Sequence, residues 1–191
     1  IAEPELRAII GPNGAGKTTF CDLVSGKTPV TTGKVFYDGD EITHVQEVDI
    51  ARRGIGRKFQ TPTVFDSLTT FENLELSLPG RQGLWSNLLR ATTVAETERI
   101  EALLERVRLT EVRDTEASQL SHGQRQWLAI SALILTEPKL LLVDEPAAGL
   151  TDAETALTAE LLLELRADHT LIVIEHDMDF VRQLDSFVTV L

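Results

Sequence analysis

A glycine-rich loop near the start of the chain constrains the fold more than any other feature of the sequence. Residues 11–18 read Gly-Pro-Asn-Gly-Ala-Gly-Lys-Thr, which matches the phosphate-binding pattern G-x-x-x-x-G-K-[ST]. The loop joins a predicted strand, Leu6–Ile10, to a predicted helix, Lys17–Val24. At average residue frequencies such a pattern arises by chance in well under about one chain in a hundred. An ordinary glycine-rich turn is therefore the weaker interpretation, and we expect a P-loop core.

The residue types in this loop suit the binding of a nucleoside triphosphate. Glycines at 11, 14 and 16 let backbone N–H groups approach phosphate oxygens closely, and the following helix adds its positive N-terminal end. Lys17 is predicted to reach the β- and γ-phosphates, and the Thr18 hydroxyl to ligate Mg²⁺. The loop thus predicts a nucleoside triphosphate and Mg²⁺ as ligands, with the nucleotide held by Asn13, Gly14, Ala15, Gly16, Lys17, Thr18 and Thr19.

Two adjacent acids, Asp144 and Glu145, end the apolar run Leu140–Val143. A fully apolar run is typical of a parallel strand covered on both faces, and ligands of such sheets bind beyond the carboxyl ends of the strands. Asp144 is therefore predicted to hold the magnesium shell, and Glu145 to orient or deprotonate the attacking water. Alone, the pair would equally well be solvated acids at a turn; the phosphate loop favours the catalytic interpretation.

Two further polar residues leave predicted strands. His176 follows the apolar run Leu171–Ile174 and could reach the γ-phosphate, whereas Gln60 follows a predicted strand over 54–59 and could bind magnesium or water. The alternatives are a surface or satisfied core histidine and an exposed loop amide. Those alternatives would be preferred if the other motifs were absent.

The periodicity of the remaining segments predicts an α/β chain interrupted by helices. Residues 33–43 have the pattern of a hairpin around an Asp-Gly turn, and helical spacing recurs between about 66 and 137. Ser121 with Gln124, and Thr151 with Glu154, are predicted to begin helices through capping boxes. We predict one domain over 1–191, with a RecA-like parallel-sheet core (about 1–65 and 138–191), a small antiparallel β portion and a helical lobe (about 66–137).

Composition excludes several classes of partner. Eighteen Lys and Arg against 30 Asp and Glu give a formal net charge of −12, which disfavours direct contact with nucleic acid or anionic lipid. One basic cluster, formed by Arg52, Arg53, Arg57 and Lys58, is predicted to be a solvated loop or helix end. A single cysteine, Cys21, cannot form an internal disulfide and fits a reducing cytosol. No apolar run approaches the ~20 residues that span a bilayer, so a membrane role would require a partner.

The segment Leu120-Ser-His-Gly-Gln124 makes the comparison with known families specific. It resembles the Leu-Ser-Gly-Gly-Gln signature of ABC ATPases, with His122 where glycine is usual. The resemblance implies an ABC-type fold that hydrolyses ATP to drive transmembrane transport, on the cytoplasmic face of the inner membrane. His122 could donate to the nucleotide or point into solvent.

The resemblance also implies partners. Two ATPase subunits, identical or different, would pair head to tail, so that Ser121, Gly123 and Gln124 of one complete the nucleotide site of the other. In that family Asp152 communicates across the interface, Gln60 senses magnesium and the membrane subunit, and His176 holds the γ-phosphate. The region after Gln60, with 61–65 as the candidate contact, would receive the membrane permease.

Within the family, residues 147–151 and 175–178 resemble the branched-chain amino acid group of importers. Residues 121–124 with 57–65 are more similar to its urea-uptake branch. The aromatic residue that stacks on adenine normally precedes the first core strand, so the resemblance implies a chain trimmed at both ends, with Tyr37 as a weak substitute.

Two alternatives exist within the ABC superfamily. A soluble ATPase of DNA repair or chromosome structure would carry a long coiled coil between phosphate loop and signature. Here only about a hundred residues separate these motifs, too few for such an arm. A ribosome-associated protein would normally carry two cassettes and basic extensions. The net charge of −12 disfavours that class.

Overall fold

The computed structural model describes residues 4–58, 63–79 and 92–191. Contacts divide the chain into two compact units. The first, which we call the core unit, comprises residues 1–60, 138–148 and 155–191. The second, the helical unit, comprises residues 61–137 and 149–154.

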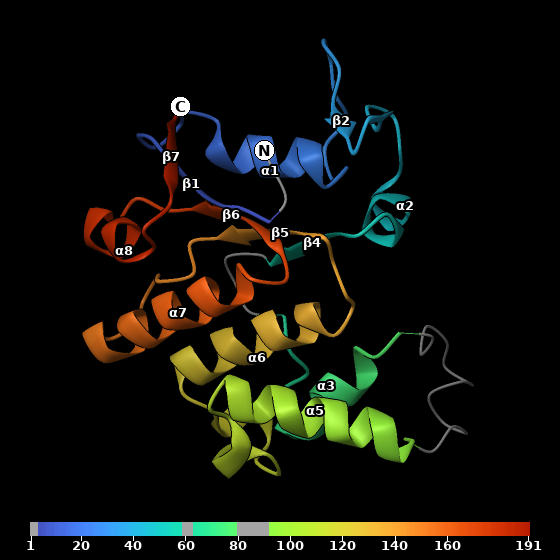
Figure 1. Ribbon diagram of the computed structural model, residues 1–191, viewed down its shortest axis with the longest axis vertical. Helices are drawn as coiled ribbons and strands as arrows, with labels where there is room; N and C mark the ends of the chain where they lie inside the picture. Colours follow the sequence, from blue (N-terminus) through green and yellow to red (C-terminus); the bar gives the residue numbers. More distant parts are fainter. Residues whose placement is uncertain (1–3, 59–62, 80–91) are drawn as a thin grey trace. The chain divides into compact units, whose positions relative to one another are not determined.

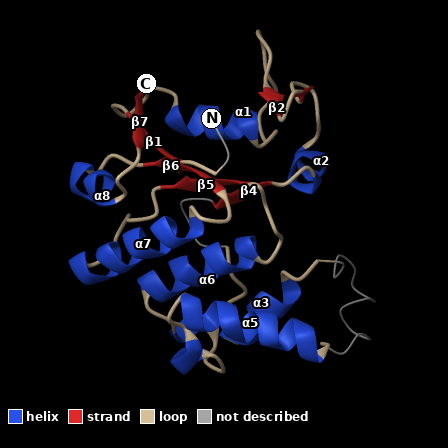
Figure 2. Cartoon of the chain, viewed as in Figure 1, coloured by secondary structure: helices blue, strands red, loops and turns tan. Residues whose placement is uncertain are grey.

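A parallel sheet forms the centre of the core unit (Figures 1 and 2). Its strand order is β4-β5-β6-β1-β7, and every neighbouring pair is parallel. Since parallel neighbours need crossover connections, β1 lies beside β6 and β7, which come more than 150 residues later in the sequence. The strands are β1 (Leu6–Ile10), β4 (Ile55–Lys58), β5 (Leu140–Asp144), β6 (Thr170–Ile174) and β7 (Phe187–Val190).

Helices cover both faces of this sheet, which is why β5 and β6 are buried along their whole length. On one face, Leu142 and Ile172 pack with Cys21 of α1 and Ile50 of α2 in a single apolar cluster. The part of α7 that belongs to the core unit lies over the opposite face (Figure 1). The helices are α1 (Lys17–Val24), α2 (Glu47–Arg52), α7 (Asp152–Leu165) and α8 (Met178–Gln183).

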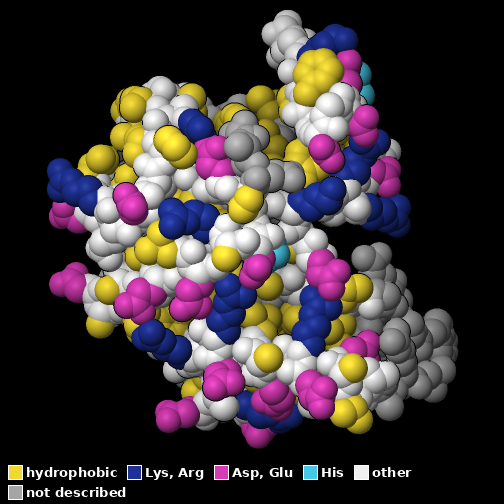
Figure 3. Space-filling model, in the orientation of Figure 1, with side chains coloured by type: hydrophobic (Ala, Val, Ile, Leu, Met, Phe, Trp, Pro, Cys, Tyr) yellow, Lys and Arg dark blue, Asp and Glu magenta, His cyan; other side chains and the backbone are white. Residues whose placement is uncertain are grey.

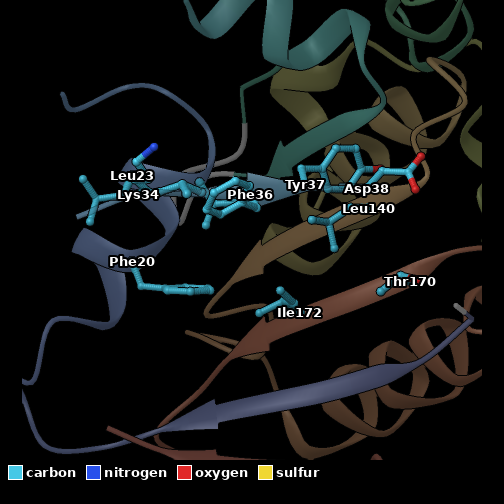
Figure 4. A pocket seen from close by; sticks show the side chains of 11 residues that line it. Phe20, Leu23, Lys34, Phe36, Tyr37, Asp38, Leu140, Thr170 and Ile172 are labelled. Carbon is cyan, nitrogen blue, oxygen red and sulfur yellow. The ribbon is translucent and has the colours of Figure 1, made fainter. Parts of the chain in front are cut away.

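The predicted hairpin is present but short, with β2 (Phe36–Tyr37) antiparallel to β3 (Asp40–Glu41). Beside it lies an apolar cavity of about 590 Å³, whose lining includes Phe20, Tyr37, Leu140 and Thr170 (Figure 4). Leu140 and Thr170 are the first residues of their strands, whereas the phosphate loop follows the last residue of β1. Tyr37 therefore lies near the amino ends of β5 and β6, at the opposite edge of the sheet from the loop.

The helical unit contains α3 (Thr70–Leu76), α5 (Val94–Arg106) and α6 (His122–Ile134), with 3₁₀ turns η1 (Thr110–Val112) and η2 (Ala117–Gln119). The predicted capping box of Ser121 and Gln124 is confirmed, and Thr69 and Thr93 cap α3 and α5 in the same way. Asn73 is buried and binds backbone groups of Phe65, Leu68 and Thr69. Within the described ranges, no helix combines the length and apolar character needed to cross a bilayer.

Candidate functional site

The phosphate loop connects β1 to α1, as the sequence predicts. Gly14 and Gly16 have φ of +86° and +98°, where a side chain would be strained, and a side chain at either would meet open space. The backbone on this side of the loop is therefore accessible to a ligand. Gly11 has a different reason to be glycine, because a Cβ there would lie 2.8 Å from the carbonyl oxygen of Leu191.

Lys17 places a cation inside the loop. Its side chain is buried, and its ammonium donates to the carbonyl oxygens of Gly11 (2.8 Å) and Pro12 (3.1 Å). Thr18 and Thr19 are exposed in the first turn of α1. The loop thus combines N–H donors, a helix N-terminus and a fixed positive charge, which together suit a polyphosphate.

Asp144 ends β5, where the parallel register places it beside the end of β6. Its carboxylate lies 3.5 Å from Nη2 of Arg57 in β4, and the same guanidinium binds Asp22 of α1 and Ser25. Burial raises the pKa of the Asp144 carboxyl, and the charge of Arg57 opposes that rise. The predicted magnesium ligand is therefore fixed through Arg57 to the helix that follows the phosphate loop.

The prediction for the basic cluster is half wrong. Arg52 and Arg53 have side chains 65% and 41% exposed at the end of α2, as expected. Arg57 and Lys58, however, are buried, with only 5% of the Arg57 side chain exposed. They belong to strand β4, and the alternation of a strand sends neighbouring side chains to opposite faces, both of which are covered here. Charge count alone could not reveal that the cluster spans a helix end and a strand.

Lys58 is a candidate site residue that the sequence did not single out as part of the site. It is 4% exposed, and its ammonium finds no hydrogen-bond acceptor among residues 4–58, 63–79 and 92–191. Burial lowers the pKa of Lys58 to about 8, against the opposing charges of Asp144, Glu175 and Glu145. Lys58 therefore contributes positive charge to the edge of the sheet that holds the predicted catalytic acids.

Glu145 and His176 lie close together, since each follows one of the neighbouring strands β5 and β6. His176 Nδ1 is 3.6 Å from Oε1 of Glu145 and 3.8 Å from Oε2 of Glu175. Glu145 has a positive φ of 45° and donates its N–H to the carbonyl of Ile174 (2.9 Å). A non-glycine residue in this conformation costs on the order of 1–3 kcal/mol and often marks a functional site.

Glu175 is a second residue that the sequence did not single out. It is 1% exposed, and its carboxylate accepts N–H groups of Ala147 (3.0 Å), His176 (3.0 Å) and Asp177 (3.3 Å). A buried carboxylate with several N–H donors is a stable arrangement. Glu175 thereby fixes the backbone that carries His176 and the turn after Glu145. Its position immediately after a buried strand was the available signal.

The signature segment lies in the helical unit. Ser121 is exposed at the N-cap of α6, and Gly123 is buried against Glu154, whose Oε1 also accepts from the Ser121 hydroxyl (3.2 Å). His122 is exposed, with its ring over Gly149 and its Nε2 3.4 Å from Nε2 of Gln126. Asp152 is exposed as the first residue of α7.

The predicted residues therefore fall into two sets. The loop residues, Asp144, Glu145 and His176 belong to the core unit, whereas Ser121, Gly123, Gln124 and Asp152 belong to the helical unit. Gln60, Thr61 and Pro62 of the predicted magnesium and permease contacts lie outside the described residues.

Comparison with known proteins agrees with these features. The sequence profile of a family described as "ABC transporter" matches residues 1–148. The branched-chain amino acid transport ATP-binding protein BraF of Pseudomonas aeruginosa is 35% identical over 201 residues, covering 100% of this chain and 78% of that protein. The branched-chain amino acid transport ATP-binding protein LivG of Escherichia coli K12 is 36% identical over 195 residues, covering 97% of this chain and 76% of that protein.

Solved structures show the same fold. A nucleotide-free ATP-binding cassette from an ABC transporter superposes with a TM-score of 0.85 at 29% identity, covering 100% of this chain and 78% of that one. A cassette solved as a dimer in a post-hydrolysis state, bound to ADP and phosphate, gives 0.80 at 27% identity, covering 96% and 79%. The chain belongs to the ABC transporter family, as an ATP-binding domain that hydrolyses ATP to drive transport.

Proposed function

We propose that this chain is the ATPase subunit of an importer for branched-chain amino acids or a related small polar solute. The single observation that carries the proposal is the edge of the core sheet, where the phosphate loop, Asp144, Glu145 and His176 lie at or just after the ends of strands of one parallel sheet. The names of BraF and LivG, which refer to branched-chain amino acid transport, support the solute class. They also disfavour the alternative of a DNA-repair or ribosomal ATPase.

The loop is proposed to hold the triphosphate of ATP through its N–H groups and Lys17, with Asn13, Gly14, Ala15, Gly16, Thr18 and Thr19 completing the contact. The open space over Gly14 and Gly16 and the buried ammonium of Lys17 support this role. When a phosphate arrives, the ammonium can exchange its bonds to two neutral loop carbonyls for bonds to phosphate oxygens, which are stronger because both partners are charged. The loop is therefore prepared for an anion without a large rearrangement.

Magnesium is proposed to bind Thr18, Asp144 and Gln60 together with the phosphates. No cluster of three His, Cys, Asp or Glu side chains suited to a metal occurs in the described part of the chain. Mg²⁺ in phosphoryl-transfer enzymes commonly uses one or two carboxylates plus substrate oxygens rather than a complete protein cage. A single buried carboxylate held by Arg57 fits that arrangement. The ion would neutralise charge that develops on the phosphates.

Glu145 is proposed to accept the proton of the attacking water, and His176 to hold the γ-phosphate. Their separation of 3.6 Å lets one water or phosphate oxygen contact both groups. His176 is 61% exposed, so its ring is accessible to a ligand. Glu175 is proposed to keep both residues in place through its bonds to the backbone.

The nucleotide site is proposed to be half a site. Ser121, Gly123 and Gln124 of a second, head-to-tail subunit would complete it, with Asp152 communicating across the interface. A solved dimer of a related cassette bound to ADP and phosphate supports this assembly. The beginning of α6 offers N–H groups and a helix dipole to phosphate oxygens.

A membrane permease is the second proposed partner, docked through the region after Gln60 on the cytoplasmic face of the inner membrane. We expect no direct contact with nucleic acid. On the face drawn in Figure 3, Lys and Arg side chains alternate with Asp and Glu rather than forming one basic surface. This interspersed pattern, with the net charge of −12, favours a protein partner over a polyanion.

The test of the catalytic assignment is Glu145→Gln. The variant keeps the size of the side chain but removes the base, so we expect ATP turnover to fall by about 10²–10⁴-fold while ATP still binds and accumulates in a trapped dimer. Phosphate release measures the rate, and sedimentation measures the dimer. Glu105→Gln, which changes an exposed acid of α5, is the control. Turnover equal to wild type in Glu145→Gln would remove Glu145 from the mechanism.

Lys17→Ala tests the phosphate loop. Loss of about two charge-assisted hydrogen bonds, each worth roughly 1.5–3 kcal/mol, predicts that ATP affinity falls by about 10²–10⁴-fold. Titration with a fluorescent ATP analogue measures this loss. Lys34→Ala, at a side chain 63% exposed, should bind as wild type does. Wild-type affinity in Lys17→Ala would contradict the proposed site.

The finer proposal is that urea or a short amide is the solute, from the resemblance of residues 121–124 and 57–65 to the urea-uptake branch. The test copurifies the full-length protein with its permease and solute-binding partner and then measures uptake of labelled urea and labelled leucine. It distinguishes urea from branched-chain amino acids as the solute. Leucine uptake without urea uptake would restrict the importer to branched-chain amino acids.

A further inference from the structure

The hydroxyl of Ser121 is already engaged within its own chain. As the N-cap of α6 it accepts the N–H of Gln124 (3.2 Å), and it donates its proton to Oε1 of Glu154 (3.2 Å). Glu154 lies 33 positions away in sequence, at the third position of α7. Both residues belong to the helical unit, so the contact is internal to one compact body.

Glu154 is itself held firmly. Its Oε2 accepts the N–H (3.0 Å) and the hydroxyl (2.9 Å) of Thr151, which leaves Oε1 directed at Ser121. These bonds, first among them the Thr151 N–H, lower the pKa of the Glu154 carboxyl, so the group is a carboxylate at neutral pH. A Cβ on Gly123 would lie 2.5 Å from Oε1, so glycine at this position leaves room for the carboxylate.

The chemistry of a hydroxyl makes this contact exclusive. Serine has one proton to donate, and a phosphate oxygen, like a carboxylate oxygen, only accepts. Ser121 therefore cannot donate to Glu154 and to a phosphate at the same time. A phosphate next to Ser121 would also place two negative groups on one hydroxyl, which is unfavourable at any dielectric constant.

We propose that Glu154 is a positioning residue that holds the proton of the Ser121 hydroxyl until ATP bound to the other subunit replaces Glu154 as its acceptor. The inference rests on the proposed function, in which Ser121 completes the site of a second subunit. Exchange of the acceptor breaks the hydrogen bond that joins Ser121 to the start of α7, where Asp152 lies two residues before Glu154. Glu154 remains bound to Thr151 after the exchange.

The experiment is Glu154→Gln in the full chain, with an imido analogue of ATP that cannot be hydrolysed. A neutral amide is a weaker acceptor for the Ser121 proton and does not repel phosphate. We expect the analogue concentration for half-maximal dimer formation, measured by sedimentation, to fall roughly threefold to tenfold. Binding of the analogue to the monomer, which uses the phosphate loop, should be unchanged.

Glu72→Gln is the matched control. Glu72 forms the same capping box with Thr69 at the start of α3 but is not bonded to Ser121. Its carboxylate accepts the N–H (2.8 Å) and the hydroxyl (2.9 Å) of Thr69, and its own N–H donates to the Thr69 hydroxyl (3.2 Å). It should cost similar stability without promoting the dimer. In a Ser121→Ala background the gain from Glu154→Gln should shrink to the part that comes from removing a negative charge, because no hydroxyl remains for which the acceptors compete.

The outcomes separate this inference from the proposed function. If wild type dimerises with the analogue and Glu154→Gln dimerises equally or less well, the positioning role is wrong and the composite site stands. If the gain persists undiminished in Ser121→Ala, Glu154 does not act through Ser121, and the inference also fails. If wild type forms no dimer with the analogue at any concentration, the composite site is overturned, and this inference with it.

Discussion

The carboxyl edge of the core sheet and the signature region of the helical unit handle polar groups in opposite ways. At the sheet edge, Arg57, Lys58, Asp144 and Glu175 are charged and all at least nine-tenths buried as side chains. In the signature region, Glu154 accepts hydrogen bonds from the hydroxyls of Ser121 and Thr151, at the exposed starts of α6 and α7. The first region is a set of buried charges, and the second a set of exposed caps.

This difference separates fixed from exchangeable contacts. Removing the partner of a buried charge strongly destabilises the folded protein, since water cannot replace that partner. An exposed capping bond is worth roughly 1 kcal/mol, because water competes for both groups. Groups that must stay in place for phosphoryl transfer are thus suited to the first region. Contacts that must exchange with a second subunit are suited to the second.

The largest loss of stability is expected at Arg57, in the region of buried charges. Arg57→Ala leaves the carboxylates of Asp144 and Asp22 without their buried partner, so the free energy of unfolding should fall by about 3–5 kcal/mol. Urea denaturation followed by circular dichroism measures the loss.

Arg53→Ala is the control for this prediction, since Arg53 belongs to the same basic cluster. Its side chain is 41% exposed and contacts the exposed Asp40 at 3.1 Å. Removing it should change stability by at most about 0.5 kcal/mol. Equal losses in the two variants would show that burial does not separate the two arginines.

The two regions were also unequally predictable from sequence. The signature region follows from local rules: Ser121 with Gln124 and Thr151 with Glu154 have capping-box spacing, and both boxes form. At the sheet edge, the phosphate loop and the strand ends of Asp144, Glu145 and His176 were also predicted, because apolar runs mark buried parallel strands.

What sequence could not supply were contacts across strands. Burial of Arg57 and Lys58 depends on β4 pairing with β5, whose residues lie about 85 positions later, and on helices that cover both faces. The hydrogen bond from Ser121 to Glu154 likewise joins two capping boxes, and local spacing accounts for each box by itself. No spacing rule connects them, since the distance in space is set by packing of the whole unit.

A second, smaller effect is expected from the pH dependence of Lys58. Its pKa falls from the usual 10.5 to about 8 in the folded chain. Between these values the unfolded chain binds one more proton than the folded chain, so stability should rise with pH from about 8 to about 10.5. The rise attributable to this residue is about 3 kcal/mol. Below pH 8 both states are protonated, and the slope from Lys58 vanishes.

Lys58→Met isolates that contribution. Replacing a buried ammonium by an apolar side chain of similar length should stabilise the chain at pH 7 and remove the rise at alkaline pH. Urea denaturation of both proteins at intervals from pH 7 to 10.5 gives the difference, in which other titrating groups cancel. A difference between the two proteins that stays constant with pH would mean that Lys58 is not buried as a charge.

The smallest loss of stability is expected at an exposed cap of the helical unit. Thr93 accepts the N–H of Glu96 at 3.2 Å at the start of α5. Thr93→Ala should lower the free energy of unfolding by about 1 kcal/mol, whereas Thr93→Asp, which keeps an acceptor and adds a favourable charge at a helix N-terminus, should restore it. Urea denaturation at low ionic strength measures both. If Thr93→Ala cost as much as Arg57→Ala, exposed caps would be as rigid as the buried charges, and the exchange proposed for Ser121 would lose its physical basis.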